Sequence, residues 1–276
     1  MEFLDDRRVR IEGVEIVLAQ PTELTVQWVG QEEVIKQLLA AWMVIDQKDL
    51  PFNPRVLGKP GVGKTTLAYA AARRLRKEVY MFQATMDTRP EDLIITPVVA
   101  SGGGITYAAS PLVTAMLKGA VCIVDEGNRM SEKSWASLAP LLDDRRYVES
   151  LVAGIKIPAL KGFLFAVTMN DDASTYEIPE YIHSRLQPQI YLDFPEREEE
   201  KMILRENLPF VDDEILEYVV AFLQRAHEND EIYTARDGIN IARYAAKLIR
   251  SEGLSVVDAL QEAVSMTLGP DVVQYL

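Results

Sequence analysis

The stretch Gly58-Lys-Pro-Gly-Val-Gly63-Lys64-Thr65 decides the fold, because it follows a β-type run at 55–57 and opens a helical run from Lys64 to about residue 76. It matches the phosphate-loop pattern, in which glycines let backbone N–H groups wrap a phosphate at the positive end of a helix. Lys64 is predicted to reach the β- and γ-phosphates and the Thr65 hydroxyl to bind Mg²⁺. The predicted nucleotide contacts are Gly58, Lys59, Pro60, Gly61, Val62, Gly63, Lys64, Thr65 and Thr66.

A pair of acids, Asp125-Glu126, ends the apolar run Val121–Val124, 61 residues beyond Lys64. In a parallel sheet this strand end lies beside the phosphate loop, where Asp125 can hold Mg²⁺ and Glu126 can deprotonate the attacking water. Acids are also common at strand ends because the chain re-enters solvent there. With the phosphate loop upstream, we interpret Asp125 as a metal ligand and Glu126 as the base that hydrolysis requires.

Strand-like and helix-like runs alternate between residues 25 and 195, which predicts an α/β domain with a parallel sheet covered on both faces. The expected helices are 31–42, 64–76, 90–95 and 131–142, and the expected strands are 55–57, 78–83, 121–124 and 163–168. Two glycine-containing inserts, near 97–107 and 147–160, are predicted β-hairpins. Residues 1–24 are expected to form an N-terminal arm or hairpin. Residues 196–276 are expected to form a helical lid, with a capping box at Thr234.

Composition limits the classes of partner. The net charge is −13, and residues 196–276 contribute −9 of it through 17 acids and 8 bases. Nucleic acid is therefore not the expected partner, because binding to it depends on basic groups, although a small basic pore inside an assembly stays open. A single cysteine, Cys122, excludes an internal disulfide, and two histidines leave no plausible zinc cluster. Without a leader or an apolar run of about 18 residues, we expect a soluble, cytoplasmic protein with no membrane insertion.

From about residue 25 to 250 the order and spacing of the motifs resemble those of the AAA+ ATPases. Within them the chain resembles the MoxR-like group with its CbbQ, NorQ and gas-vesicle relatives. The matching segments are Trp28-Val-Gly-Gln-Glu32, Arg89-Pro-Glu-Asp-Leu93, Ser110-Pro-Leu112, Asp125-Glu-Gly-Asn-Arg129, Leu141-Leu-Asp-Asp-Arg-Arg-Tyr-Val148, Ile178-Pro-Glu-Tyr-Ile-His-Ser-Arg185 and Thr234-Ala-Arg236. The resemblance implies a three-layer αβα P-loop NTPase core, a C-terminal all-helical lid and ATP as substrate. Gly127 departs from the usual Ile and Met130 from the usual Ala, which affects the assignment to a subfamily.

The resemblance also implies roles for single residues. Val29 and Gly30 correspond to residues near the adenine, and Asn170 to the sensor-1 residue that helps to hold the attacking water. Arg185 corresponds to the arginine finger that reaches the γ-phosphate of the next subunit, although the usual Arg-Phe pair is replaced by Arg-Leu. Arg236 corresponds to sensor 2 in the lid. The plain alternatives are a strand-end asparagine, a surface ion pair and a solvated helix-start arginine.

Three further arginines, Arg129, Arg145 and Arg146, are weaker candidates for the trans-acting arginine. A role in subunit contacts suits them better.

The resemblance finally implies a homo-oligomer, a hexameric ring, whose Mg²⁺-dependent ATP hydrolysis remodels or activates a protein partner such as a von Willebrand A-type protein. The hairpins near 97–107 and 147–160 correspond to the helix-2 insert and the pre-sensor-1 hairpin. A nucleic-acid motor such as a helicase or loader is the alternative, and a non-catalytic nucleotide-gated scaffold is a third hypothesis. Acidity favours the protein partner, while Glu126 and Asn170 argue against the scaffold.

The first hairpin carries the apolar residues Val98, Val99, Ile105 and Tyr107 around a Gly102–Gly104 turn. We predict that these side chains form a small contact surface for the partner. The alternative is that they pack the hairpin onto its own helix.

Overall fold

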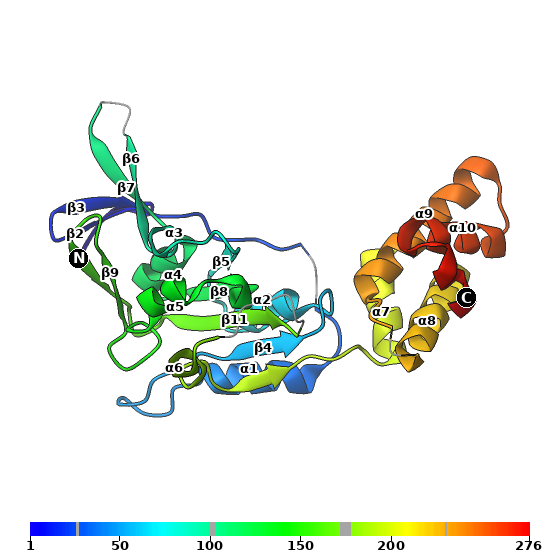
Figure 1. The fold of residues 1–276 in the computed structure, drawn as a ribbon, viewed down its shortest axis with the longest axis horizontal. Coiled ribbons are helices and arrows are strands. Elements are labelled where there is room, and N and C mark those ends of the chain that lie inside the picture. The colour runs from blue at the N-terminus through cyan, green and yellow to red at the C-terminus, as the bar shows by residue number, and fades with distance from the viewer. Residues whose placement is uncertain (26–27, 100–102, 172–177, 230) are drawn as a thin grey trace. The chain divides into compact units, whose positions relative to one another are not determined.

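The structure is a computed structural model, which describes residues 1–25, 28–99, 103–171, 178–229 and 231–276. The chain divides into two compact units. The first contains residues 1–25, 33–58 and 64–191, and the second contains residues 26–32, 59–63 and 192–276. The first unit is α/β, whereas the regular structure described in the second is helical (Figure 1).

A five-stranded sheet with the order β12-β4-β11-β8-β5 forms the centre of the first unit. Its strands are β4 (Arg55–Gly58), β5 (Val79–Gln83), β8 (Val121–Asp125), β11 (Leu164–Asn170) and β12 (Gln189–Tyr191). All four pairings are parallel. Because parallel strands bring their carboxyl ends to one edge, Gly58, Asp125 and Asn170 lie along the same edge of the sheet, where α/β proteins bind their ligands. The register pairs Asn170 with Gly58 and Gln83 with Asp125.

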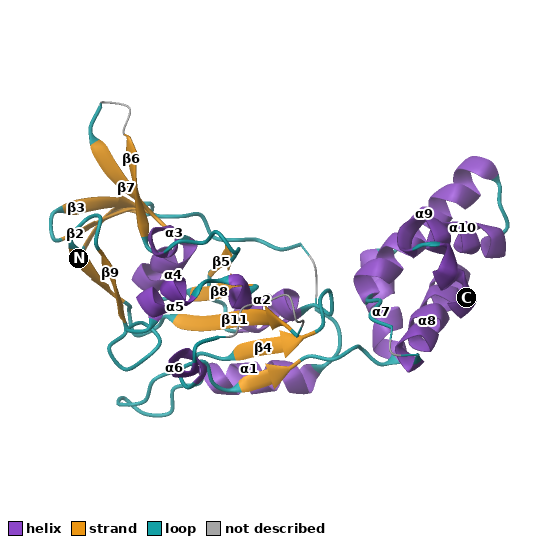
Figure 2. Cartoon of the chain, in the orientation of Figure 1, coloured by secondary structure: helices purple, strands orange, loops and turns teal. Residues whose placement is uncertain are grey.

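Helices cover both faces of this sheet (Figure 2). Val121 to Val124 are all fully buried, and successive side chains of a strand point to opposite faces. The helices of this unit are α1 (Glu32–Trp42), α2 (Lys64–Arg74), α3 (Pro90–Leu93), α4 (Pro111–Lys118), α5 (Glu132–Leu138), α6 (Glu180–His183) and the 3₁₀ turn η1 (Gly127–Arg129). The predicted αβα parallel-sheet fold is confirmed.

Three helices end earlier than the sequence pattern suggested. The helix expected to reach about residue 76 is α2, which ends at Arg74. The helix expected to reach residue 142 is α5, which ends at Leu138; Pro140 follows, and it has no backbone N–H to continue the helical hydrogen bonds. The helix expected to reach residue 95 is α3, which ends at Leu93 because Ile95 begins β6. Residues 111–118 were not expected to be helical, yet they form α4, which is capped by Ser110 and ended by Gly119 in the left-handed conformation.

The N-terminal segment is a three-stranded antiparallel meander rather than a two-stranded hairpin or an arm. Its strands are β1 (Glu2–Asp5), β2 (Arg8–Ile11) and β3 (Val14–Val17). β3 pairs in parallel with β7 (Ile105–Ala109), which pairs in turn with β6 (Ile95–Val99). The meander and the first insert therefore form one mixed sheet, in the order β1-β2-β3-β7-β6, and the meander buries Val9 and Ile16.

Both predicted hairpins are present. β6 and β7 are antiparallel, with Val98 opposite Thr106 and Val99 opposite Ile105; Ala100, Ser101 and Gly102, at the predicted turn, lie outside the described residues. β9 (Tyr147–Ser150) and β10 (Ile155–Pro158) form the second hairpin.

The second unit contains α7 (Arg197–Asn207), α8 (Asp213–Glu228), α9 (Ala235–Glu252), α10 (Val256–Leu268) and the 3₁₀ turn η2 (Pro270–Tyr275). Its core is a separate apolar cluster that includes Leu204, Leu216, Val219, Leu223, Ile241, Ala245, Leu260 and Val264. Thr234 caps α9 as predicted, since its backbone N–H donates to Asp237 Oδ2 at 2.8 Å. The C-terminal segment of the second unit begins at residue 192, whereas the sequence pattern predicted that the lid starts at residue 196. Among the described residues, no helix is long and apolar enough to cross a membrane.

Candidate nucleotide site

The phosphate loop joins β4 to α2, as the motif predicted. Gly61 and Gly63 have φ values of +84° and +104°, which residues with a side chain rarely adopt. Lys64 begins α2 and is buried, and its Nζ donates to the Gly58 carbonyl at 2.8 Å. Thr66, in the same helical turn, is half-buried. The lysine thus lies folded over the end of β4, from where its ammonium can reach a phosphate.

The end of β8 contacts the first turn of α2. The Thr65 hydroxyl donates to Asp125 Oδ1 at 2.6 Å, and the Thr168 hydroxyl donates to the same oxygen. The hydroxyl of Thr65 and the carboxylate of Asp125 are two hard oxygen donors, the type of ligand that Mg²⁺ prefers. Thr65 and Asp125 therefore fit the metal that the motif implies.

Glu126 follows directly in the left-handed conformation, with φ 54° and ψ 41°. Its Oε1 accepts from Asn170 Nδ2 at 3.3 Å, and its Oε2 accepts from Gln83 Nε2 at 3.2 Å. Arg129 Nε lies 2.7 Å from Oε2. The carboxylate is therefore held by groups from the ends of β5 and β11 and from η1, in an orientation that an exposed strand-end acid would not keep.

Asn170 is the last residue of β11 rather than a residue after the strand. Its carbonyl accepts from Asn128 Nδ2 at 2.8 Å, and both asparagines are buried. The side-chain amide nitrogen of Asn170 donates to Glu126, so the predicted sensor and the predicted base are in hydrogen-bond contact.

Arg185 follows α6 and contacts residues of the first unit. Its Nη1 donates to the Tyr181 carbonyl, and its Nε lies 3.5 Å from Asp143 Oδ2. Arg145 also pairs with Asp143, and its hydrogen bonds, followed by the smaller effect of the Arg185 charge, lower the pKa of that carboxyl to about 2. The Arg185 side chain is half-buried beside Asp143. Glu126 contacts Asn170, Gln83 and Arg129, so the predicted finger and the predicted base have different partners.

Two of the weaker arginine candidates have partners within the first unit. Arg129 pairs with Glu126 of its own chain. Arg146 donates to the Phe163 carbonyl at 2.7 Å and lies over the Phe163 ring, and its burial lowers the pKa of the guanidinium. Arg146 thus supports the first unit from inside, and Arg145 remains as an exposed candidate for subunit contacts.

The remaining predicted residues belong to the second unit. Trp28 Nε1 donates to the Gly30 carbonyl at 2.7 Å, beside Val29. A Cβ on Gly61 would lie 2.8 Å from Thr234 Oγ1, so this loop glycine packs against the cap of α9. Arg236 lies in the first turn of α9 with an exposed side chain.

Sequence reasoning missed Gln83 and Thr168, which lie in strands of the parallel sheet, and Asn128, which lies in the 3₁₀ turn η1 after β8. Their position was a usable signal, because side chains at the carboxyl ends of adjacent parallel strands converge.

The phosphate loop, the acidic pair and the parallel sheet together define a P-loop nucleotide-binding protein. Residues 55–186 match the AAA domain (dynein-related subfamily). The chain is 30% identical over 141 residues to Protein NorQ of Paracoccus denitrificans, which covers 51% of this chain and 49% of that protein. It is 26% identical over 179 residues to Chaperone MoxR1 of Mycobacterium tuberculosis, which covers 64% of this chain and 44% of that protein. The chain spans about half the length of these curated relatives.

Solved structures share the fold. The Thermotoga maritima RuvB Holliday junction branch migration motor superposes with a TM-score of 0.56 at 18% identity, covering 86% of this chain and 70% of RuvB. A putative ATPase from Cytophaga hutchinsonii superposes with a TM-score of 0.52 at 19% identity, covering 86% and 81%. The match to the AAA domain and the similarity to NorQ and MoxR1 support the resemblance to the MoxR-like AAA+ proteins.

Proposed function

We propose that the chain hydrolyses ATP with Mg²⁺, and that Glu126 is the general base. As the oxygen of the attacking water bonds to the γ-phosphorus, the Glu126 carboxylate takes its proton, and the bond from that phosphorus to the bridging oxygen breaks to leave ADP and phosphate. The contact of Glu126 with Asn170 carries this proposal, because it holds the carboxylate of the proposed base beside the amide that would help to hold the attacking water. Lys64 neutralises charge on the transferred phosphoryl group.

Thr65 and Asp125 would hold Mg²⁺, which would supply positive charge that neutralises the phosphate groups. The Thr65–Asp125 contact of 2.6 Å supports this pairing. The backbone of residues 58–63 would wrap the phosphates, and Val29 and Gly30 would lie near the adenine.

The proposed working form is a homo-oligomeric ring, hexameric as in the resemblance. Arg185 would leave Asp143 and Tyr181 to reach the γ-phosphate of a neighbouring subunit, where a guanidinium stabilises transition-state charge. A half-buried ion pair at 3.5 Å is a loose contact, which is compatible with a side chain that changes partner. Arg236, exposed at the start of α9, would read the phosphates in its own subunit.

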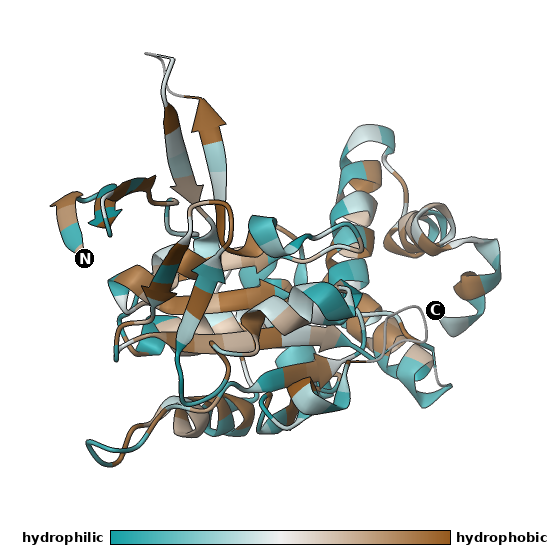
Figure 3. Cartoon of the chain, turned by 60° about the vertical axis from the view of Figure 1, so that its left-hand side comes forward, coloured by the Kyte–Doolittle hydropathy of each residue, from teal (hydrophilic) through white to brown (hydrophobic). Residues whose placement is uncertain are grey.

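ATP turnover would then act on a protein partner, for which the first hairpin offers an apolar surface. Val99 is 79% exposed and Ile105 is 73% exposed, with Val98 also exposed, whereas Tyr107 is half-buried against the core. Figure 3 shows hydrophobic residues along the strands of the projecting hairpin. This exposure favours a contact role over packing of the hairpin onto its own helix.

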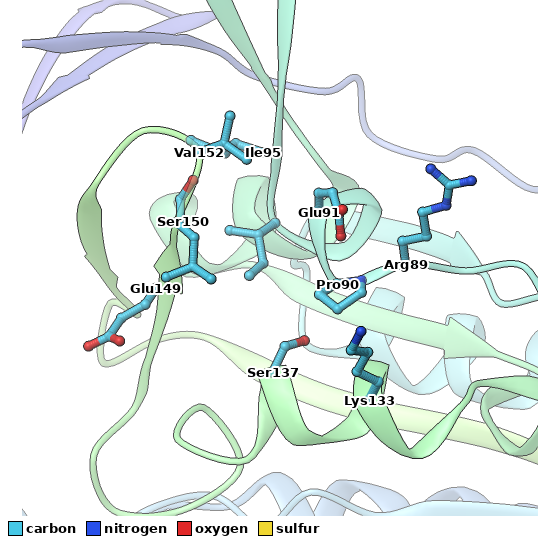
Figure 4. A pocket seen from close by; sticks show the side chains of 11 residues that line it. Arg89, Pro90, Glu91, Ile95, Lys133, Ser137, Glu149, Ser150 and Val152 are labelled. Atoms are coloured by element: carbon cyan, nitrogen blue, oxygen red, sulfur yellow. The ribbon is translucent and has the colours of Figure 1, made fainter.

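The second hairpin adds a groove of about 520 Å³ beside it. Figure 4 shows its walls, with Pro90 and Glu91 of α3 opposite Ser150 and Val152, and Lys133 and Ser137 of α5 below. Leu151, at the hairpin turn, is 94% exposed. A protein partner such as a von Willebrand A-type domain would use both surfaces.

A nucleic-acid motor is the second candidate, since the fold is shared with RuvB. The exposed hairpin residues Val98, Val99 and Ile105 are apolar, and the net charge of −13 opposes binding to phosphate backbones.

The experiment is phosphate release by the purified chain with Mg-ATP, in the presence of single-stranded DNA or of a protein encoded beside this chain. We expect Mg²⁺-dependent turnover that the protein stimulates and DNA does not. Stimulation by DNA alone would favour the motor, and the absence of Mg²⁺-dependent turnover in every condition would contradict the ATPase assignment.

A further inference from the structure

The second unit contains a strained stretch of backbone ahead of α1. Gly30 has φ +78°, and Gln31, which follows it, has φ +45°. Glutamine rarely adopts the left-handed conformation, and such a residue keeps it only where its surroundings hold it there.

Side chains hold both ends of the peptide unit that joins Gly30 to Gln31. Its carbonyl oxygen accepts from Trp28 Nε1 at 2.7 Å, and its N–H donates to Glu199 Oε1 at 2.8 Å. The second bond ends on a carboxylate, so it is of the stronger, charge-assisted kind. Asp193 adds a third link, because its carbonyl accepts from the side chain of Gln31 at 3.2 Å.

These contacts are also tight in shape. A Cβ on Gly30 would lie 2.7 Å from the Glu199 carboxylate, and a Cβ on Gly63 would lie 3.0 Å from the Trp28 ring. The indole that holds the Gly30 carbonyl therefore packs on the glycine directly before Lys64. Glu199, Gly30, Trp28 and Gly63 form a continuous series of contacts inside the second unit.

We propose that Glu199 is a positioning residue for nucleotide binding, which acts through the Gly30–Gln31 peptide and Trp28. When the Glu199 carboxylate is removed, Gln31 can relax from its strained conformation. The Gly30 carbonyl is then no longer held in place as the acceptor for Trp28, and the contact of Trp28 with Gly63 loosens. The backbone that would contact the adenine and the phosphates is then less preorganised, which lowers the affinity for nucleotide. This inference rests on the proposed nucleotide site. It predicts a loss in binding rather than in chemistry, because Glu199 acts here on the Gly30–Gln31 peptide and Trp28 and not on the proposed base Glu126.

The test compares Glu199→Ala with Glu198→Ala. Glu198 is the preceding residue of α7 and is exposed, so its replacement removes the same charge from the same helical turn. We expect Glu199→Ala to raise the Kd and KM for Mg-ATP about 10-fold, with kcat within about 2-fold of wild type, since one hydrogen bond to a charged group is lost. Glu198→Ala should match wild type. Glu199→Gln should recover part of the affinity, because its amide oxygen can still accept.

A second variant, Trp28→Phe, keeps an aromatic ring at this position and removes the N–H donor. It should weaken binding in the same direction, and it carries the test with Glu199→Gln if Glu199→Ala does not fold. Wild-type affinity in Glu199→Ala, or a loss of kcat at unchanged affinity, would overturn the positioning role while leaving the ATPase intact. A wild-type chain that binds no ATP would overturn the proposed function itself.

Discussion

Glu200 provides a quantitative test of the packing of the second unit. It lies in α7 with 0% of its surface exposed, and its Oε2 accepts from Gln224 Nε2 at 2.8 Å. Oε1 is buried with no hydrogen-bond partner among the described residues. Burial raises the pKa of Glu200 from 4.5 to about 7, and the hydrogen bond from Gln224 opposes part of that rise.

The direction of the pH effect on the free energy of unfolding follows from proton binding to Glu200. Between pH 4.5 and pH 7 the folded chain keeps a proton on Glu200 that the unfolded chain has released, so the free energy of unfolding falls as the pH rises through this window. At about 1.4 kcal/mol per pH unit, the full loss is about 3 kcal/mol. The stabilisation is fully present below pH 4.5 and lost above pH 7. Glu200→Gln replaces the acid by a neutral amide of the same shape and should remove the loss.

The assay is urea unfolding followed by circular dichroism from pH 5.5 to pH 8.5, which avoids precipitation near the pI of about 4.7. Over this range wild type should lose about 2 kcal/mol relative to Glu200→Gln. Glu198→Gln, at an exposed position of the same helix, is the control and should follow wild type. Parallel curves for wild type and Glu200→Gln would refute the account of this buried carboxyl.

Three further predictions concern assembly, packing and the partner surface. Arg185→Ala should bind ATP normally but hydrolyse it about 10³-fold more slowly, and mixing it with Glu126→Gln should restore some turnover; no recovery despite proven subunit exchange would count against a shared site. Gly127→Ala should lower stability by about 1–3 kcal/mol in thermal unfolding, because its Cβ would lie 2.3 Å from Val167 Cγ2, and an unchanged Tm would contradict that. Replacing residues 100–106 by a short Gly-Ser turn should spare folding and basal turnover but abolish partner stimulation, whereas retained stimulation would move the contact to the second hairpin.

The parts of the site that sequence predicted are those coded by adjacent residues. The phosphate loop fixes its own glycine conformations, and Asp125-Glu126 ends a buried strand, so local pattern was sufficient. The capped start of α9 was equally local. α4 was missed although Ser110-Pro111 at its start and Gly119 at its end were readable cap signals.

The parts that sequence did not predict depend on contacts between distant segments. β3 meets β7 across about ninety residues, and no local pattern specifies a parallel pairing of that kind. The link from Glu199 to Gln31 spans 168 residues, and the unusual Gly127 is explained only by the closeness of Val167. Such features arise from tertiary packing, which overrides what each segment shows alone.

The most direct test of the central claim is nucleotide binding measured beside phosphate release for Glu126→Gln, with Lys64→Ala as the contrasting variant. Glu126→Gln should bind Mg-ATP as wild type does and release no phosphate, because it loses the base but keeps the phosphate loop. Lys64→Ala should lose affinity, because its ammonium no longer neutralises the phosphates. Wild-type phosphate release by Glu126→Gln would contradict the account.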